Sequence, residues 1–106
     1  MSQTATHRAI EAVWRIEAAS VIAGVARLVR DVGVAEELAQ DALVAALERW
    51  PDTGVPDNPG AWLMTTAKNR ARDRLRLDAL HTRKHDQIGH ELEALQADVE
   101  PDFVDA

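Results

Sequence analysis

Hydrophobic residues recur along the chain at the three- and four-residue spacing of amphipathic helices, and no stretch alternates as a strand does. The first such stretch predicts a helix over residues 6–31. Gly33 is its expected end, because glycine adopts the left-handed conformation of a helix C-terminus at little cost. The apolar stripe of this helix consists of Ile10, Trp14, Val21, Val25, Leu28 and Val32. Glu17 points into the stripe, so we expect it to pair with Arg70 or Arg74.

A second helix is predicted over residues 34–49, with small residues down the centre of its buried face. These are Ala35, Ala39, Ala42 and Ala46, and their size lets another helix approach closely. Leu38 flanks this stripe on one side, and Leu43, Leu47 and Trp50 flank it on the other. The opposite face is acidic around one apolar residue and consists of Glu37, Gln40, Asp41, Val44 and Glu48.

Residues 50–58 are predicted as a loop, because two prolines and a glycine disfavour helix there. Asn58 before Pro59 is a typical start of a helix, which we expect to continue to at least Leu80. Its expected buried face consists of Leu63, Met64, Ala67, Ala71 and Leu75. Its polar and cationic face consists of Thr65, Lys68, Asn69, Arg72 and Arg76.

The predicted architecture is therefore all-α, a three-helix bundle with a trailing segment. We expect a disordered N-terminus over residues 1–5, one helical domain over 6–84 and an acidic linker over 85–106. The linker holds a weak helical stripe of Ile88, Leu92 and Leu95 that should end at Glu100-Pro101. We also expect the natural protein to continue beyond this segment.

Charge changes the picture more than overall composition does. The 106 residues carry a formal net charge of −6, which by itself argues against nucleic acid. Residues 68–84, however, hold seven basic and two acidic residues, whereas residues 85–106 hold seven acidic and no basic ones. The basic block is consistent with a nucleic-acid contact and equally with an ordinary solvated helix face.

Few residues support catalysis or a metal. The chain has no cysteine, no glycine-rich phosphate loop and no serine placed beside a base, so we expect no enzyme, no catalytic residue and no cofactor. His81 and His85 share a helix face but lack a clear third ligand, so no metal site is expected. No apolar run reaches the ~20 residues of a membrane span, and a cytoplasmic location is the expectation.

Trp62 near Lys68 and Asn69 combines an aromatic ring with a cation and an amide. Single-stranded bases are bound by this combination of stacking, neutralised phosphate and edge hydrogen bonds. The same spacing fits a core tryptophan that holds the preceding loop, and both interpretations stay open at this point.

Two motifs resemble region 2 of the extracytoplasmic-function sigma factors of bacterial RNA polymerase. The first is Ala35-Glu36-Glu37-Leu38-Ala39-Gln40-Asp41-Ala42-Leu43, and the second is Trp62-Leu63 followed by Ala67, Asn69, Asp73 and Arg76. The segment Gly54-Val55-Pro56-Asp57-Asn58-Pro59-Gly60-Ala61-Trp62-Leu63-Met64 is similar to a subgroup with a large C-terminal helical-repeat extension after region 4. The resemblance covers roughly residues 10–80.

The resemblance implies two partners, RNA polymerase core and promoter DNA. Docking on the β′ clamp helices would use Glu37, Gln40, Asp41 and Val44, with Leu43 and Leu47 as apolar neighbours. Recognition and melting of the −10 element, with capture of a flipped non-template base, would use Asn58, Trp62, Thr65, Lys68, Asn69, Arg72 and Arg76. An anti-sigma factor or the protein's own C-terminal extension are further partners that the resemblance implies.

The chain also departs from the family. Thr66 stands where the family usually has Ile, aromatic residues near the melting surface are limited to Trp62, and region 4 is missing. Two alternatives therefore stay open. One is a helical protein-interaction or regulatory module, of the kind that binds an anti-sigma factor, without promoter binding. The other is a generic dimerising bundle.

Overall fold

The computed structural model describes the backbone of residues 3–104 and the side chains of residues 4–95, and this part of the chain is helical with no strand. The helices are α1 (Gln3–Val29), α2 (Val32–Thr53) and α3 (Pro59–Val104). Residues 1–73 and 74–106 form two compact units, so α3 contributes to both. The prediction of an all-α fold with three helices is confirmed. Met1 and Ser2, within the expected disordered N-terminus, lie outside the described residues.

The turn between α1 and α2 lies earlier than predicted. α1 ends at Val29, and Arg30 adopts the left-handed conformation with φ of 58° and donates its N–H to the Ala26 carbonyl at 2.7 Å. Asp31 then caps α2, since its Oδ1 accepts the Val34 N–H at 3.0 Å. Because this cap starts α2 at Val32, Gly33 lies inside the second helix, and the prediction that Gly33 ends the first was wrong.

α2 continues past the predicted start of the loop. Pro51 lies within the helix, which runs to Thr53, so the connection to α3 comprises residues 54–58 rather than 50–58. Gly54 ends the helix with φ of 87°, a conformation that favours glycine, and its N–H reaches the Trp50 carbonyl at 2.8 Å. Pro51 has no N–H to donate to the Leu47 carbonyl, and its ring crowds that carbonyl, yet α2 continues for two more residues, to Thr53.

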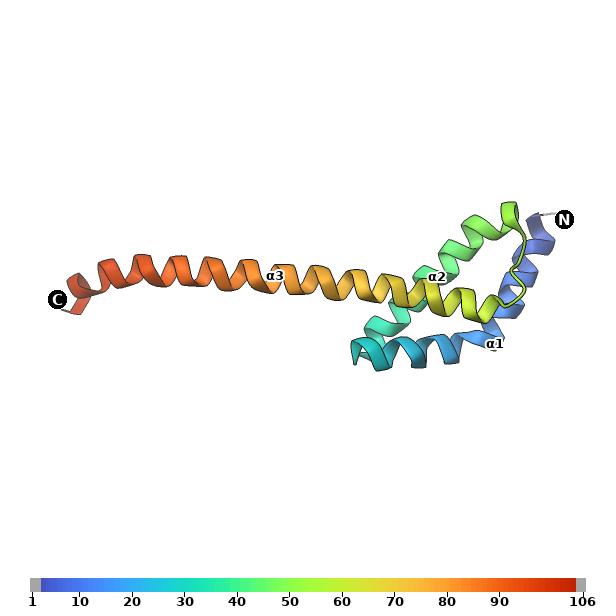
Figure 1. The fold of residues 1–106 in the computed structure, drawn as a ribbon, viewed down its shortest axis with the longest axis horizontal. Helices are drawn as coiled ribbons and strands as arrows, with labels where there is room; N and C mark the ends of the chain where they lie inside the picture. The colour runs from blue at the N-terminus through green and yellow to red at the C-terminus, as the bar shows by residue number, and fades with distance from the viewer. Residues whose placement is uncertain (1–2, 105–106) are drawn as a thin grey trace. The chain divides into compact units, whose positions relative to one another are not determined.

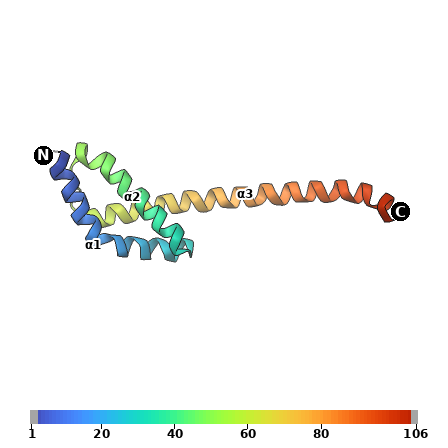
Figure 2. The same ribbon diagram turned by 180° about the vertical axis from the view of Figure 1, so that it is seen from behind.

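The start of α3 follows the prediction. Asn58 Oδ1 accepts the Ala61 N–H at 3.1 Å, which makes Asn58 the N-cap, and Pro59 occupies the first helical position. α1 bends partway along its length and packs against α2, and the first turns of α3 cross these helices (Figures 1 and 2).

One apolar core holds the first unit together. It consists of Ile10, Val21, Val25, Ala35, Leu38, Ala39, Ala42, Ala46, Trp50, Leu63, Ala67 and Ala71. The alanines within this core are completely buried, as predicted for the small-residue stripe of the second helix and for the buried face of the third. Close approach is also visible at Gly24 of α1, where an added Cβ would lie 2.7 Å from Sδ of Met64.

Several predicted burials were wrong at the edges of this unit. Leu28, Val32 and Leu75 were placed on buried faces but are 37%, 61% and 40% exposed. Val32 lies beyond the end of α1, and Leu75 lies beyond Asp73, where the first unit ends. Conversely, Trp50 was placed at a flank of the stripe and in the loop, and it is 1% exposed at the centre of the core.

Glu17 does not lie where the sequence predicted. Its carboxylate lies against Gly60, because a Cβ added there would be 2.6 Å from Glu17 Cδ. Gly60 belongs to the first turn of α3, ten residues before Arg70, which corresponds to about 15 Å along a helix. The predicted pairing with Arg70 was therefore wrong, and the carboxylate lies at the N-terminal end of α3.

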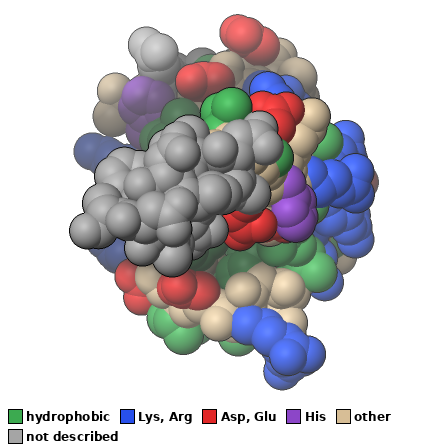
Figure 3. Space-filling view, turned by 90° about the vertical axis from the view of Figure 1, so that its left-hand side faces the viewer, with side chains coloured by type: hydrophobic (Ala, Val, Ile, Leu, Met, Phe, Trp, Pro, Cys, Tyr) green, Lys and Arg blue, Asp and Glu red, His purple; other side chains and the backbone are tan. Residues whose placement is uncertain are grey.

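The second unit contains the rest of α3, and the helix extends past Pro101 to Val104, further than predicted. The apolar residues of residues 74–95 are all exposed and include Leu77, Leu80, Ile88, Leu92 and Leu95. The space-filling view shows apolar side chains exposed between charged ones (Figure 3). Over the described residues, no helix carries a stretch that is long and apolar enough to cross a bilayer.

Candidate functional site

The outward face of α2 is as the sequence predicted. Glu37, Gln40 and Asp41 are exposed, and Val44 between them is 50% exposed. The opposite side of the same helix is buried in the core, so these side chains lie outside it. The face is therefore a polar surface with an apolar centre, which suits contact with another protein.

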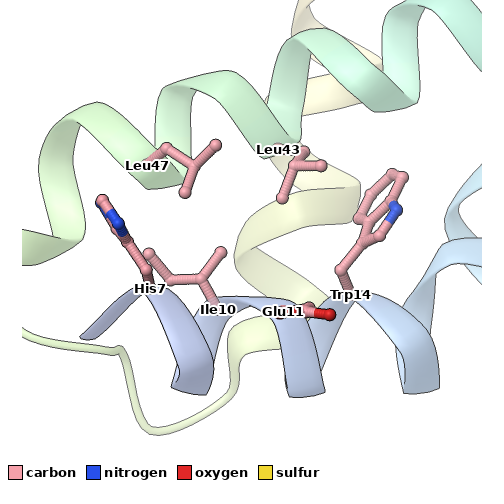
Figure 4. A pocket seen from close by; sticks show the side chains of 6 residues that line it. All are labelled: His7, Ile10, Glu11, Trp14, Leu43 and Leu47. Carbon is pink, nitrogen blue, oxygen red and sulfur yellow. The ribbon is translucent and has the colours of Figure 1, made fainter. Parts of the chain in front are cut away.

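Leu43 and Leu47 lie at the edge of this face and belong to a groove. Leu43 is half-buried against the core, and Leu47 is 37% exposed. Figure 4 shows both leucines pointing toward Ile10 and Trp14 of α1. The groove has a volume of about 490 Å³, and His7 and Glu11 complete its lining. The two leucines thus combine a packing role with an accessible apolar surface.

Four of the predicted nucleic-acid residues lie on adjacent turns of α3. Thr65, Asn69 and Arg72 are exposed on α3, and Lys68 is half-buried. Arg72 Nη1 donates to Asn69 Oδ1 at 3.2 Å, which ties the amide to the guanidinium. Arg76 is exposed and belongs to the second unit.

Trp62 and Asn58 have structural partners. The ring of Trp62 packs edge-to-face on Trp50, with centroids 5.1 Å apart and planes at 68°, and the side chain is half-buried. Asn58 is the N-cap of α3, while its amide N–H₂ group is not used by that bond. The tryptophan pair holds the two ends of the 54–58 loop together, and this geometry favours the loop-holding interpretation of Trp62.

Sequence reasoning missed a basic residue of α1. Arg27 lines a cleft with Lys68 and Arg72, although more than forty residues separate them in sequence. No sequence signal marks this residue, since a cation in the last turn of a helix commonly offsets the helix dipole. The crossing of α1 by α3 brings the three cations together.

Among the described residues, no group of three His, Asp or Glu side chains is arranged to hold a metal ion. The candidate surfaces are thus a polar and apolar face on α2, the groove beside it, and a cationic surface on α3 and α1.

Comparison with known proteins identifies the family. A model of sigma-70 region 2 matches residues 14–79, which include α2 and the first turns of α3. An uncharacterized protein of Rhizobium meliloti (strain 1021) is 39% identical over 56 residues, covering 53% of this chain and 13% of that protein. The matched segment spans only a small part of this relative's length. No solved structure matches the chain. The family match covers well over half of the chain and includes the α2 face and the cationic turns of α3, so the chain belongs to the sigma-70 region 2 family of transcription-initiation factor domains.

Proposed function

We propose that this chain is the region 2 domain of an extracytoplasmic-function sigma factor that binds RNA polymerase and contacts the −10 element. Membership of the sigma-70 region 2 family supports a role in polymerase binding and promoter recognition. The similarity of residues 54–64 to one subgroup supports a longer natural protein with a C-terminal helical-repeat extension.

The main support for polymerase binding is the outward face of α2. Gln40 and Asp41 are exposed beside the half-exposed Val44, and the other side of the helix is buried. Docking on the β′ clamp helices would use Glu37, Gln40, Asp41 and Val44, with Leu43 and Leu47 at the apolar edge. Burial of the two leucines and the valine supplies apolar contact, and the acids and the amide give orientation.

A pull-down of core polymerase tests this proposal. Changing Gln40→Ala and Asp41→Lys together should weaken polymerase binding by roughly tenfold or more, because it removes an amide and reverses a charge at the interface. The matched control is Gln87→Ala with Asp86→Lys, the same chemical change on exposed residues of the second unit.

Circular dichroism of both variants should show unchanged helix content. If the α2 variant binds polymerase as tightly as the control, the assignment of this face is wrong. If its helix content falls instead, the buried face has been misassigned.

Promoter contact is proposed for the polar surface of α3. Thr65, Lys68, Asn69 and Arg72 present hydroxyl, amide and cationic groups on adjacent turns, and Arg76 continues the same stripe in sequence. The amide N–H₂ group of Asn58, which has no hydrogen-bond partner among the described residues, and the half-buried ring of Trp62 would complete the contact with an unstacked base. Capture of a flipped base offsets the few kcal/mol that unstacking it costs.

The apolar groove favours a second candidate, a protein-interaction module without promoter binding. Ile10, Trp14, Leu43 and Leu47 offer an apolar surface that a helix of an anti-sigma factor or of the C-terminal extension would fit. Salt dependence separates the two functions. Affinity for DNA falls steeply as the salt concentration rises, because protein binding releases counterions from the phosphates. A protein-interaction module without promoter binding shows no DNA binding at any salt concentration.

A further inference from the structure

A cleft of about 290 Å³ lies between the C-terminal half of α1 and the first turns of α3. Gly24, Arg27 and Leu28 line it from α1, and Lys68 and Arg72 line it from α3. All five residues belong to the first compact unit. The cleft is thus a feature of the folded bundle and joins residues that are far apart in the chain.

The shape of the cleft depends on Gly24. A Cβ at this position would lie 2.7 Å from Met64 Sδ and 3.9 Å from Lys68 Cε. The absence of a side chain therefore lets α3 approach α1 and lets the aliphatic part of Lys68 lie over the glycine. Leu28, 37% exposed, gives the same wall an apolar surface.

The lining carries three positive charges and no carboxylate. Within the described side chains, neither Arg27 nor Lys68 takes part in a hydrogen bond or an ion pair, and Arg72 donates to the neutral Asn69 amide. Three like charges around one cleft repel one another, and a bound anion relieves this repulsion. Two of the cations are guanidinium groups, which suit paired hydrogen bonds to phosphate oxygens.

We propose that this cleft binds a backbone phosphate of a single DNA strand, and that Arg27 of α1 is part of the nucleic-acid surface. The inference rests on the proposed function, because it assigns a strand to the surface that contains Lys68 and Arg72. A strand is favoured over a free phosphate ion because exposed polar residues of α3, Thr65 and Asn69, lie beside the cleft residues Lys68 and Arg72. They can extend the contact beyond one phosphate.

Fluorescence anisotropy with a labelled single-stranded oligonucleotide of mixed sequence tests the proposal, since phosphate contacts do not depend on the bases. In the full 106-residue chain, Arg27→Ala should weaken binding roughly three- to tenfold at low salt and reduce the slope of log K against log salt by about 0.7. Arg27→Lys should keep most of the slope because it keeps the charge. Arg8→Ala, an exposed arginine of α1 outside the cleft, is the control for the loss of one positive charge.

A purely structural role for Arg27 at the end of α1 predicts something different. Arg27→Ala would then lower stability in urea by an amount that Arg27→Lys restores, and both variants would keep the wild-type salt slope. That result, or equal behaviour of Arg27→Ala and Arg8→Ala, overturns the assignment of the cleft. Displacement of the oligonucleotide by inorganic phosphate far beyond chloride of equal ionic strength also overturns it, in favour of a free anion.

The same binding measurements distinguish failure of the cleft assignment from failure of the proposed promoter contact. If Arg72→Ala weakens binding while Arg27→Ala matches its control, only the role of the cleft fails and α3 remains a DNA-binding surface. If the wild-type chain binds no single strand, promoter contact fails together with the cleft, while the polymerase pull-down still stands.

Discussion

Trp50 shows how one residue can hold the loop, the core and a helix end together. It is 1% exposed, contacts Trp62 edge-to-face at 5.1 Å and lies four residues before Gly54, where α2 ends. Its indole Nε1 is buried and has no hydrogen-bond partner among the described residues. A buried donor without a partner costs about 1–3 kcal/mol, so the ring must contribute through packing alone.

Replacement of Trp50 separates these contributions. Trp50→Ala should destabilise the chain by about 3–5 kcal/mol, because it leaves a large cavity in the only core of the first unit that the structure describes. Trp50→Phe keeps an aromatic ring beside Trp62 and removes the unpaired N–H, so we expect a loss within about 1.5 kcal/mol.

Urea unfolding followed by circular dichroism measures both variants. Equal destabilisation by Trp50→Phe and Trp50→Ala would indicate that the indole N–H is satisfied in solution and that its bond matters.

At the scale of elements, the start of α3 combines a cap with a nearby carboxylate. Asn58 supplies the cap, and Glu17 of α1 places its carboxylate against Gly60 in the first turn. The first turn of a helix carries unpaired N–H groups and the positive end of the helix dipole, so a carboxylate there is favourable. This contact between α1 and α3 explains how a carboxylate is accommodated on a mostly apolar stripe.

A double-mutant cycle checks the new environment of Glu17. Glu17→Gln should cost about 0.3–1 kcal/mol, and its effect should add to that of Arg70→Ala within about 0.5 kcal/mol, since the two residues do not meet. A coupling free energy well above that limit would indicate that Glu17 and Arg70 form the ion pair predicted from the sequence.

The cap at Asn58 allows structure and DNA contact to be separated. Asn58→Asp keeps the oxygen that accepts the Ala61 N–H, so the free energy of unfolding should stay within about 0.5 kcal/mol of wild type. The change also removes the amide donor and adds a negative charge, so binding of a single strand should weaken.

Asn58→Ala is the companion variant and should lose about 1 kcal/mol of stability through the missing cap. If Asn58→Asp binds the strand like wild type, Asn58 acts only as a cap and leaves the nucleic-acid surface.

At the scale of the whole molecule, charge is divided along the chain. Residues 68–84 are strongly basic, and residues 85–106 hold seven acidic residues and no lysine or arginine. We expect the acidic segment to repel phosphates and to compete for the same cations. We expect the intact chain to bind single-stranded DNA weakly and duplex DNA hardly at all, since opening a duplex costs more than one captured base returns.

Removing residues 85–106 tests this balance, because the formal net charge changes from −6 to +1 with the loss of seven acids. The shortened chain should bind the single strand several-fold more tightly at low salt, and the difference should vanish as salt rises. Circular dichroism of the shortened chain, which should show that residues 1–84 keep their helix content, is the control for folding. Equal affinity of both chains at low salt would mean that the acidic segment does not compete.

The helices themselves were predictable from the sequence because their signals are local. The spacing of Ala35, Ala39, Ala42 and Ala46 places them on one face of a helix whatever surrounds it, and that face is buried. The same periodicity gave the exposed face around Val44, and the Asn58-Pro59 pair gave the start of α3. Boundaries failed where two local signals competed, as when the Asp31 cap started α2 ahead of the expected stop at Gly33.

Only the tertiary structure decided which residues meet across helices. The burial of Trp50, the position of Glu17 at Gly60 and the cleft that joins Arg27 to Lys68 and Arg72 all depend on where α3 crosses α1 and α2. A periodic pattern specifies the direction of a side chain around its own helix axis but not the neighbour it faces. The crossing is set by close packing of the small residues of these helices, among them Gly24, and is therefore a property of the assembled bundle.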